Sequence, residues 1–211
     1  MKIKICGLFR EEDIDYANET APDYVGFVFA ESKRRVTPTL AGRLRARLSG
    51  AILPVGVFVD APVEEIATLY RAGVFSIAQL HGKEDETFIR RLKTACDAPI
   101  IKAFRVSDEV FLRDTPDSDA FNHIQTAADY VLFDSGAGSG KTFDWRLTRL
   151  LQPPPRPVFL AGGIGLENIS RAVLQAPFCI DVSSGAETNG VKDREKMAAL
   201  VKTVHASGKN I

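Results

Sequence analysis

Eight short apolar runs recur along the chain at nearly regular intervals. Each is rich in β-branched or aromatic residues and is bounded by turn-forming residues, as expected of a buried strand. The stretches between them place apolar residues at helical spacing, for example Leu40, Leu44 and Leu48, and Thr37 before Pro38 predicts a capped helix start. The apolar runs occupy residues 2–6, 24–29, 52–59, 75–80, 100–104, 130–133, 157–161 and 178–182.

Regular alternation of strands and helices predicts right-handed crossover connections and a parallel sheet. Eight such repeats in 211 residues indicate an α/β fold of one domain, a (β/α)₈ or TIM barrel with eight parallel strands over residues 1–211. The fifth unit supports this least, because Asp114-Thr115-Pro116-Asp117 in its connection breaks any helix there. A doubly wound sheet of six or seven strands is the alternative.

The charge balance argues against partners that rely on a net electrostatic field. Lysine plus arginine and aspartate plus glutamate both total 27, so nothing draws the chain to nucleic acid or to an anionic membrane. The three cysteines, Cys6, Cys96 and Cys179, form no CxxC pair and accompany no histidine cluster, which predicts no metal site and a reducing compartment. No apolar run approaches the roughly 20 residues of a membrane span, so we expect a cytoplasmic protein.

Two ionisable side chains follow predicted strands in a way that suggests acid–base chemistry. The residues after the strands of a barrel face one shared mouth, and Cys6 and Asp134 end the first and sixth strands. A basic Cys6 requires a pKa about 1.5 units below the ordinary value for a thiol, which lysine or arginine at the mouth could supply. The alternatives are a small core residue for Cys6 and a surface carboxylate for Asp134.

Glycine-rich turns follow the last two predicted strands. Backbone N–H groups in such turns can approach a ligand closely, and the helix N-termini that follow add a positive dipole, so the pair predicts a phosphate site. A tight turn without a ligand is the alternative for the first of them. The residues concerned are Gly162, Gly163, Ser183, Ser184 and Gly185.

Two further segments have weaker signals. Residues 135–142, Ser-Gly-Ala-Gly-Ser-Gly-Lys-Thr, resemble a nucleotide phosphate loop but lack its first glycine, so we interpret them as a mobile lid over the mouth. His81 follows the fourth strand beside Gln79 and Gly82. These neighbours suit contacts with a ribose or with the wall of a pocket, so a binding or structural role is favoured over acid–base catalysis.

Together these segments resemble the phosphoribosylanthranilate isomerase family along the whole chain. No single motif decides the matter, but their order and their positions at strand ends agree with that family. The matching segments are Lys4-Ile5-Cys6-Gly7, Gly26-Phe27-Val28-Phe29 with Ser32-Lys33-Arg34, Val57-Phe58-Val59, Gln79-Leu80-His81-Gly82, residues 138–145, Gly162-Gly163 and Asp181-Val182-Ser183-Ser184-Gly185.

The resemblance implies a cofactor-free enzyme of tryptophan biosynthesis. Its reaction would be the Amadori rearrangement of N-(5-phosphoribosyl)anthranilate to 1-(2-carboxyphenylamino)-1-deoxyribulose 5-phosphate. Cys6 would be the general base that removes the proton from ribose C2, and Asp134 the general acid that protonates the ring oxygen. A small phosphosugar would then be the only partner, with the chain a monomer or a homodimer.

The resemblance also implies how the substrate is held. Arg34 would bind the anthranilate carboxylate, Asp181 would lie beside the ribose, and Gln79 and His81 would complete the substrate site. The two glycine-rich turns would hold the phosphate. The chain departs from the family's common pattern in having Leu8-Phe9-Arg10 after Cys6-Gly7 and Arg35 in place of an aromatic residue, which leaves open which arginine takes the carboxylate.

Other phosphosugar-binding barrels are the alternatives. Indole-glycerol-phosphate synthases rely on lysines at strand ends, where this chain offers only Lys102, and histidine-pathway aminosugar isomerases use a carboxylate at the position of Cys6. A non-catalytic phosphosugar-binding protein is a third possibility. The presence of both Cys6 and Asp134 argues against it, and a turnover assay separates the two.

Overall fold

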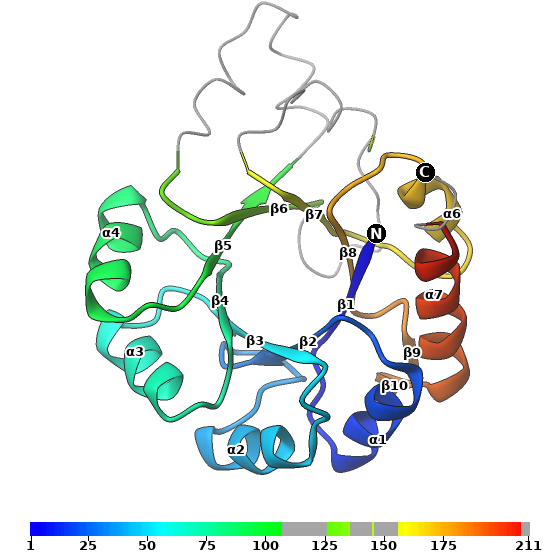
Figure 1. Cartoon of the computed structure of the whole chain (residues 1–211), viewed down its shortest axis with the longest axis horizontal. Helices are drawn as coiled ribbons and strands as arrows, with labels where there is room; N and C mark the ends of the chain where they lie inside the picture. The colour runs from blue at the N-terminus through cyan, green and yellow to red at the C-terminus, as the bar shows by residue number, and fades with distance from the viewer. Residues whose placement is uncertain (107–125, 136–144, 146–155, 208–211) are drawn as a thin grey trace, which may run out of the picture.

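The computed structural model describes residues 1–106, 126–135, 145 and 156–207. Eight parallel strands pair in chain order, and the first pairs with the last to close a barrel (Figure 1). The predicted (β/α)₈ barrel is therefore confirmed, and the doubly wound alternative was wrong. The strands are β1 (Lys2–Cys6), β2 (Tyr24–Val28), β3 (Leu53–Phe58), β4 (Ile77–Leu80), β5 (Ile100–Arg105), β6 (Tyr130–Asp134), β7 (Val158–Leu160) and β8 (Cys179–Val182).

Helices surround the ring of strands, as Figure 1 shows in a view along the barrel. Thr37 caps α2 as predicted, because its side chain accepts a hydrogen bond from the Leu40 N–H, and Pro38 begins the helix. Among the described residues, no helix is long and apolar enough to cross a membrane. The helices are α1 (Glu11–Thr20), α2 (Pro38–Arg47), α3 (Val63–Arg71), α4 (Glu86–Ala95), α6 (Ile169–Val173) and α7 (Arg194–Ser207).

The segment after β8 differs from the sequence-based expectation of a helix N-terminus beside the glycine-rich turn. A short hairpin of β9 (Glu187–Thr188) and β10 (Val191–Lys192) intervenes, and α7 begins only after it. Asn189 and Gly190 have φ values of 53° and 82°, the conformation of a tight two-residue hairpin turn that Asn-Gly favours. The hairpin lets the charged side chains of Glu187 and Lys192 turn back toward the barrel mouth.

The two ends of the barrel have opposite character. Residues that are in register on neighbouring strands point to the same side, so the interior is filled layer by layer. The lower layers are apolar and aromatic: the Phe159 ring lies 5.6 Å from those of both Tyr24 and Tyr130, measured between centroids. This packing fills the barrel interior toward its amino-terminal end, which leaves the carboxyl ends of the strands as the place for a ligand.

A buried carboxylate ties two of the loops that border this mouth to the neighbouring strand β5. Glu84 accepts hydrogen bonds from the backbone N–H groups of Asp60 at 2.7 Å and Gly82 at 2.9 Å, and from Lys102 Nζ at 3.0 Å. Lys102 also donates to the carbonyl of Gly82 at 2.8 Å. Glu84 and Lys102 are both almost completely buried, so they hold the segments after β3 and β4 against β5.

We predict that Glu84→Ala destabilises the protein by about 3–5 kcal/mol, because it leaves the buried Lys102 ammonium without its partner. The control is Glu65→Ala, which removes an exposed carboxylate from α3 and should change stability by less than about 0.5 kcal/mol. Urea unfolding of the two variants and the parent measures the difference. Equal losses in both variants would show that Glu84 does not brace the loops.

Candidate active site

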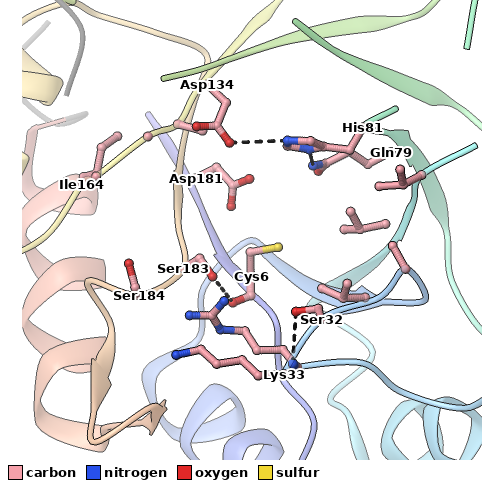
Figure 2. Close-up of a pocket in the computed structure, with 18 of the residues that line it drawn as sticks. Cys6, Ser32, Lys33, Gln79, His81, Asp134, Ile164, Asp181, Ser183 and Ser184 are labelled. Atoms are coloured by element: carbon pink, nitrogen blue, oxygen red, sulfur yellow. Dashed lines mark hydrogen bonds and ion pairs between the residues drawn. The ribbon is translucent and has the colours of Figure 1, made fainter. Parts of the chain in front are cut away.

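A cavity of about 470 Å³ opens at the carboxyl ends of the strands (Figure 2). It gathers most of the site residues predicted from the sequence, although they come from opposite ends of the chain. Gly185 is absent from its lining. The predicted residues that line it are Cys6, Arg34, Gln79, His81, Asp134, Gly162, Gly163, Asp181, Ser183 and Ser184.

Cys6 reaches the cavity because its neighbour on β2 has no side chain. Cys6 is in register with Gly26, and a Cβ atom built on Gly26 would lie 2.6 Å from the sulfur. Burial raises the pKa of the Cys6 thiol above its ordinary value, the Lys4 ammonium opposes that rise, and Asp181 adds to it. This direction is opposite to the lowered pKa that a basic Cys6 requires.

Asp134 shares the far side of the cavity with a buried glutamine and a histidine. His81 Nε2 lies 3.4 Å from Asp134 Oδ2, and Gln79 Nε2 lies 2.9 Å from His81 Nδ1 (Figure 2). Gln79 is 1% exposed, so its amide fixes the orientation of the imidazole. His81 thus directs a ring nitrogen at Asp134, an arrangement that the sequence alone did not predict.

The two neighbouring arginines differ in their surroundings. The Arg34 guanidinium donates from Nε and Nη2 to both oxygens of the Glu187 carboxylate, at 2.6 and 2.9 Å, and lines the cavity. These hydrogen bonds raise the pKa of Arg34 further above its usual range. Arg35 is exposed, pairs with the exposed Glu31 and lies outside the cavity lining.

Glu187 and Lys192 are two charged residues beside the site that sequence analysis missed. Lys192 Nζ donates to Glu187 Oε1 at 2.6 Å and to the carbonyl of Ser183 at 3.1 Å. Burial disfavours the charge of Glu187, but hydrogen bonds from Arg34 and Lys192 lower the pKa of Glu187 to about 2. The Asn-Gly pair between these residues was the available signal, since it predicts a hairpin that sets them side by side.

Asp181 lines the cavity and is held from below by Lys4. Lys4 Nζ donates to Asp181 Oδ2 at 2.8 Å, and Lys4 is completely buried. The other carboxylate oxygen, Oδ1, is buried and has no hydrogen-bond partner among the described residues. A buried acceptor without a donor costs free energy, so Asp181 is ready to accept a hydrogen bond from a ligand hydroxyl.

The glycine-rich turns after β7 and β8 lie against each other. Gly162 and Gly163 have φ values of 94° and 62°, where side chains are disfavoured. A Cβ atom on Gly185 would lie 2.0 Å from the carbonyl oxygen of Ile164, so Gly185 allows the two turns to touch. The Asn168 side chain bridges the first turn, accepting from the Gly165 N–H and donating to the Gly163 carbonyl, each at 2.9 Å.

Some predicted features lie outside the described residues. The proposed lid over residues 135–142 is among them, except for Ser135. The Ser135 hydroxyl lies close to Gly162, where an added Cβ atom would be 2.3 Å from it. Lys102, the lysine considered above for an indole-glycerol-phosphate synthase, pairs with Glu84 and does not line the cavity. Within the described part of the chain, no three His, Cys, Asp or Glu residues are grouped as metal ligands.

The fold and the ionisable side chains at its mouth define an enzyme of the (β/α)₈-barrel class. The sequence profile of the family described as N-(5'phosphoribosyl)anthranilate (PRA) isomerase matches residues 3–203. A protein of Endomicrobium trichonymphae named N-(5'-phosphoribosyl)anthranilate isomerase is 43% identical, covering 97% of this chain and 98% of its own. The chain belongs to the PRA isomerase family.

Solved structures agree with this assignment. The phosphoribosyl anthranilate isomerase of Thermotoga maritima is 33% identical, with a TM-score of 0.84 over 98% of this chain and 99% of its own. A phosphoribosyl anthranilate isomerase in complex with reduced 1-(o-carboxyphenylamino)-1-deoxyribulose 5-phosphate is 32% identical, with a TM-score of 0.82 and the same coverage.

We predict that Gly163→Val weakens binding of inorganic phosphate, because a side chain enters the turn at a backbone conformation that valine disfavours. At about ten times its Kd, phosphate should stabilise the parent by about 1.4 kcal/mol in thermal melts. The matched control is Gly73→Val, with a similar φ of 71° and open space around the added Cβ, on the loop before β4 at the opposite end of the barrel. If phosphate protects both variants equally, the turn after β7 does not bind it.

Proposed function

We propose that Cys6 and Asp134 are the base and the acid with which this isomerase of tryptophan biosynthesis rearranges N-(5'-phosphoribosyl)anthranilate. The product is 1-(2-carboxyphenylamino)-1-deoxyribulose 5-phosphate. One observation carries the proposal: a thiol at the end of β1 and a carboxylate at the end of β6 line the same cavity. A substrate bound between them would have a base near one atom and an acid near another.

In the proposed mechanism, ring opening comes first. Asp134 donates a proton to the furanose oxygen, the C1–O bond breaks, and the nitrogen lone pair forms an iminium at C1. The Cys6 thiolate then removes the proton from C2, and the electron pair of that C–H bond neutralises the iminium to give an enolamine. Return of a proton to C1 and loss of the hydroxyl proton at C2 yield the ketose, so atoms and charge balance without any redox partner.

Arg34 is the proposed clamp for the anthranilate carboxylate. Glu187 occupies the Nε and Nη2 edge of its guanidinium, and a guanidinium has five N–H donors arranged in a fork. The opposite edge, with Nη1, is therefore available to a second carboxylate. Glu187 acts as a support that fixes the plane of the guanidinium before substrate arrives, which lowers the entropic cost of binding.

The remaining site residues fit the sugar and its phosphate. Asp181 Oδ1, the buried oxygen without a partner, is the proposed acceptor for a ribose hydroxyl, and Gln79 and His81 form the adjoining wall. The phosphate is assigned to the turns after β7 and β8, where Gly162, Gly163, Ser183 and Ser184 meet, with Gly185 packing the turns together. Backbone N–H groups are the expected donors, because the chain has no net positive charge.

The proposal extends to the whole chain. Residues 1–211 would act as one catalytic domain in the cytoplasm, as a monomer or a homodimer, with no cofactor. The profile match over residues 3–203 supports one domain. One related phosphoribosylanthranilate isomerase, that of Thermotoga maritima, is described as dimeric in the structure of its engineered monomers.

The direct test is to follow freshly formed phosphoribosylanthranilate by its anthranilate fluorescence after adding the purified protein. The signal should decay at a rate proportional to protein concentration and faster than spontaneous breakdown. A rate unchanged by the protein would leave only a phosphosugar-binding function.

We predict that Cys6→Ser and Asp134→Asn each fold and bind substrate but lose about 10² to 10⁴ in kcat, because a positioned acid or base contributes that much. Cys96→Ser, at a buried cysteine outside the cavity, is the matched control and should keep parental turnover. Since burial raises the pKa of Cys6, kcat/KM of the parent should increase with pH as the thiol ionises. Turnover within threefold of the parent in either site variant would remove that residue from the mechanism.

We further predict that Arg34→Ala increases KM about thirtyfold or more, since losing one partner of a buried charge pair costs about 2–5 kcal/mol in binding. Arg35→Ala should leave KM nearly unchanged, because Arg35 is exposed and outside the cavity lining. Steady-state kinetics of both variants show which arginine binds the anthranilate carboxylate. A larger effect at Arg35 would reverse the assignment of the carboxylate clamp.

A further inference from the structure

The proposed mechanism gives no role to Lys4, a completely buried cation. Lys4 has an exposed fraction of zero and ranks among the largest fully buried side chains of the protein. Lysine is almost never fully buried unless it is paired. Lys4 lies on β1 two residues before Cys6, so both side chains point to the same face of the strand, into the barrel.

The position of Lys4 is fixed by strand pairing. Lys4 is in register with Asp181 on β8, and its ammonium donates to Asp181 Oδ2 at 2.8 Å. Lys4 also lies two positions before Cys6 on the same face of β1, and its charge favours the ionised form of the Cys6 sulfur. Lys4 does not line the cavity, whereas Cys6 and Asp181 both do. The ammonium therefore lies beneath the cavity floor, paired with Asp181 and near enough to Cys6 to favour a charge on its sulfur.

Other charges near Cys6 already have partners. Arg34 and Lys192 both attract a negative charge on the sulfur, but each is paired with Glu187 on β9. Asp181 on β8 repels such a charge. On the other neighbouring strand, β2, the residue in register with Cys6 is Gly26, which has no side chain. Lys4 is also paired, with Asp181, but among the cations near Cys6 it favours the ionised sulfur most strongly.

We propose that Lys4 is a positioning residue that holds the Cys6 sulfur in place and stabilises its thiolate for proton abstraction. This inference rests on the proposed role of Cys6 as the base. A thiolate formed without Lys4 would lie in a buried site next to the negative charge of Asp181. With Lys4, the sulfur and Asp181 share one ammonium, whose three N–H donors can serve both acceptors.

Substrate binding would strengthen this arrangement. When a ribose hydroxyl donates to Asp181 Oδ1, part of the negative charge of Asp181 is neutralised from the cavity side. The Lys4 ammonium then interacts more strongly with the sulfur. The pKa of Cys6, raised by burial in the ligand-free protein, is thereby lowered at the moment when a base is required.

The test is the pH dependence of Cys6 alkylation by iodoacetamide, with the modified cysteine identified by mass spectrometry. Lys4→Met preserves much of the side-chain volume and removes the charge. Its alkylation rate near neutral pH should fall at least tenfold, with the midpoint of the pH profile shifted upward, since a close opposite charge changes a pKa by about 1–3 units. Lys4→Arg, which keeps the charge, should recover part of the rate.

Two controls separate a specific effect from general damage. Lys102→Met removes another buried lysine from an ion pair, that with Glu84, and should leave the Cys6 profile unshifted. Lys4→Met combined with Asp181→Asn avoids an unpaired buried carboxylate if the single variant fails to fold. Because Lys4 lowers the pKa of Cys6 more than Asp181 raises it, the double variant should still be alkylated more slowly than the parent.

The outcomes are distinct. An unshifted alkylation profile in folded Lys4→Met or in the double variant, whatever its turnover, would reduce Lys4 to a structural role and overturn the inference. A shifted profile together with full turnover of Cys6→Ser would support the contact between Lys4 and Cys6 and refute Cys6 as the base. A shifted profile together with an inactive Cys6→Ser supports both.

Discussion

The pairing of β1 with β8 is the contact on which the rest of the structure depends. It joins residues 2–5 to residues 179–182 and closes the barrel. Through it, Lys4 and Asp181 meet although they are 177 positions apart in the sequence. An open sheet would leave Lys4 without its carboxylate at the level of the barrel core, where an unpaired charge is strongly destabilising. Closure and charge compensation therefore depend on each other.

The same pairing explains why the mouth can concentrate charge in a protein with equal numbers of acidic and basic residues. Two ion-pair groups lie side by side, one of Lys4 with Asp181 and one of Arg34 and Lys192 with Glu187. Each holds side chains in fixed orientations before a ligand arrives. Preorganised charges of this kind are effective in a site shielded from water, because they need not reorient during the reaction.

Much of the fold could be predicted from the sequence, because a strand buried on both faces must be apolar along its length. β1 has the predicted boundaries, and the other strands differ by one or two residues at their ends. Residues at strand ends were predictable as site candidates for the same topological reason. The β9–β10 hairpin was not predicted, although its Asn-Gly turn is a strong local signal, because the expected helix N-terminus took precedence.

Contacts across the barrel could not be obtained from local patterns. Lys4 reads as one polar residue in an alternating strand, and only the register with β8 reveals its partner. The role of Glu187 beside Arg34 likewise depends on a hairpin folding back over the mouth. The pKa of Cys6 could not be judged from the sequence, because burial, which opposes ionisation, cannot be weighed against Lys4 before both side chains are located.

The central claim is that Cys6 and Asp134 act on one phosphosugar whose phosphate is held between the turns after β7 and β8. A crystal structure of this protein with reduced 1-(o-carboxyphenylamino)-1-deoxyribulose 5-phosphate, an analogue of the product, tests it most directly. We expect the phosphate at Gly163 and Ser184, and the Cys6 sulfur within about 3.5 Å of the sugar C2, a distance suited to reaction. A phosphate bound elsewhere, or a sulfur turned away from C2, would contradict the account.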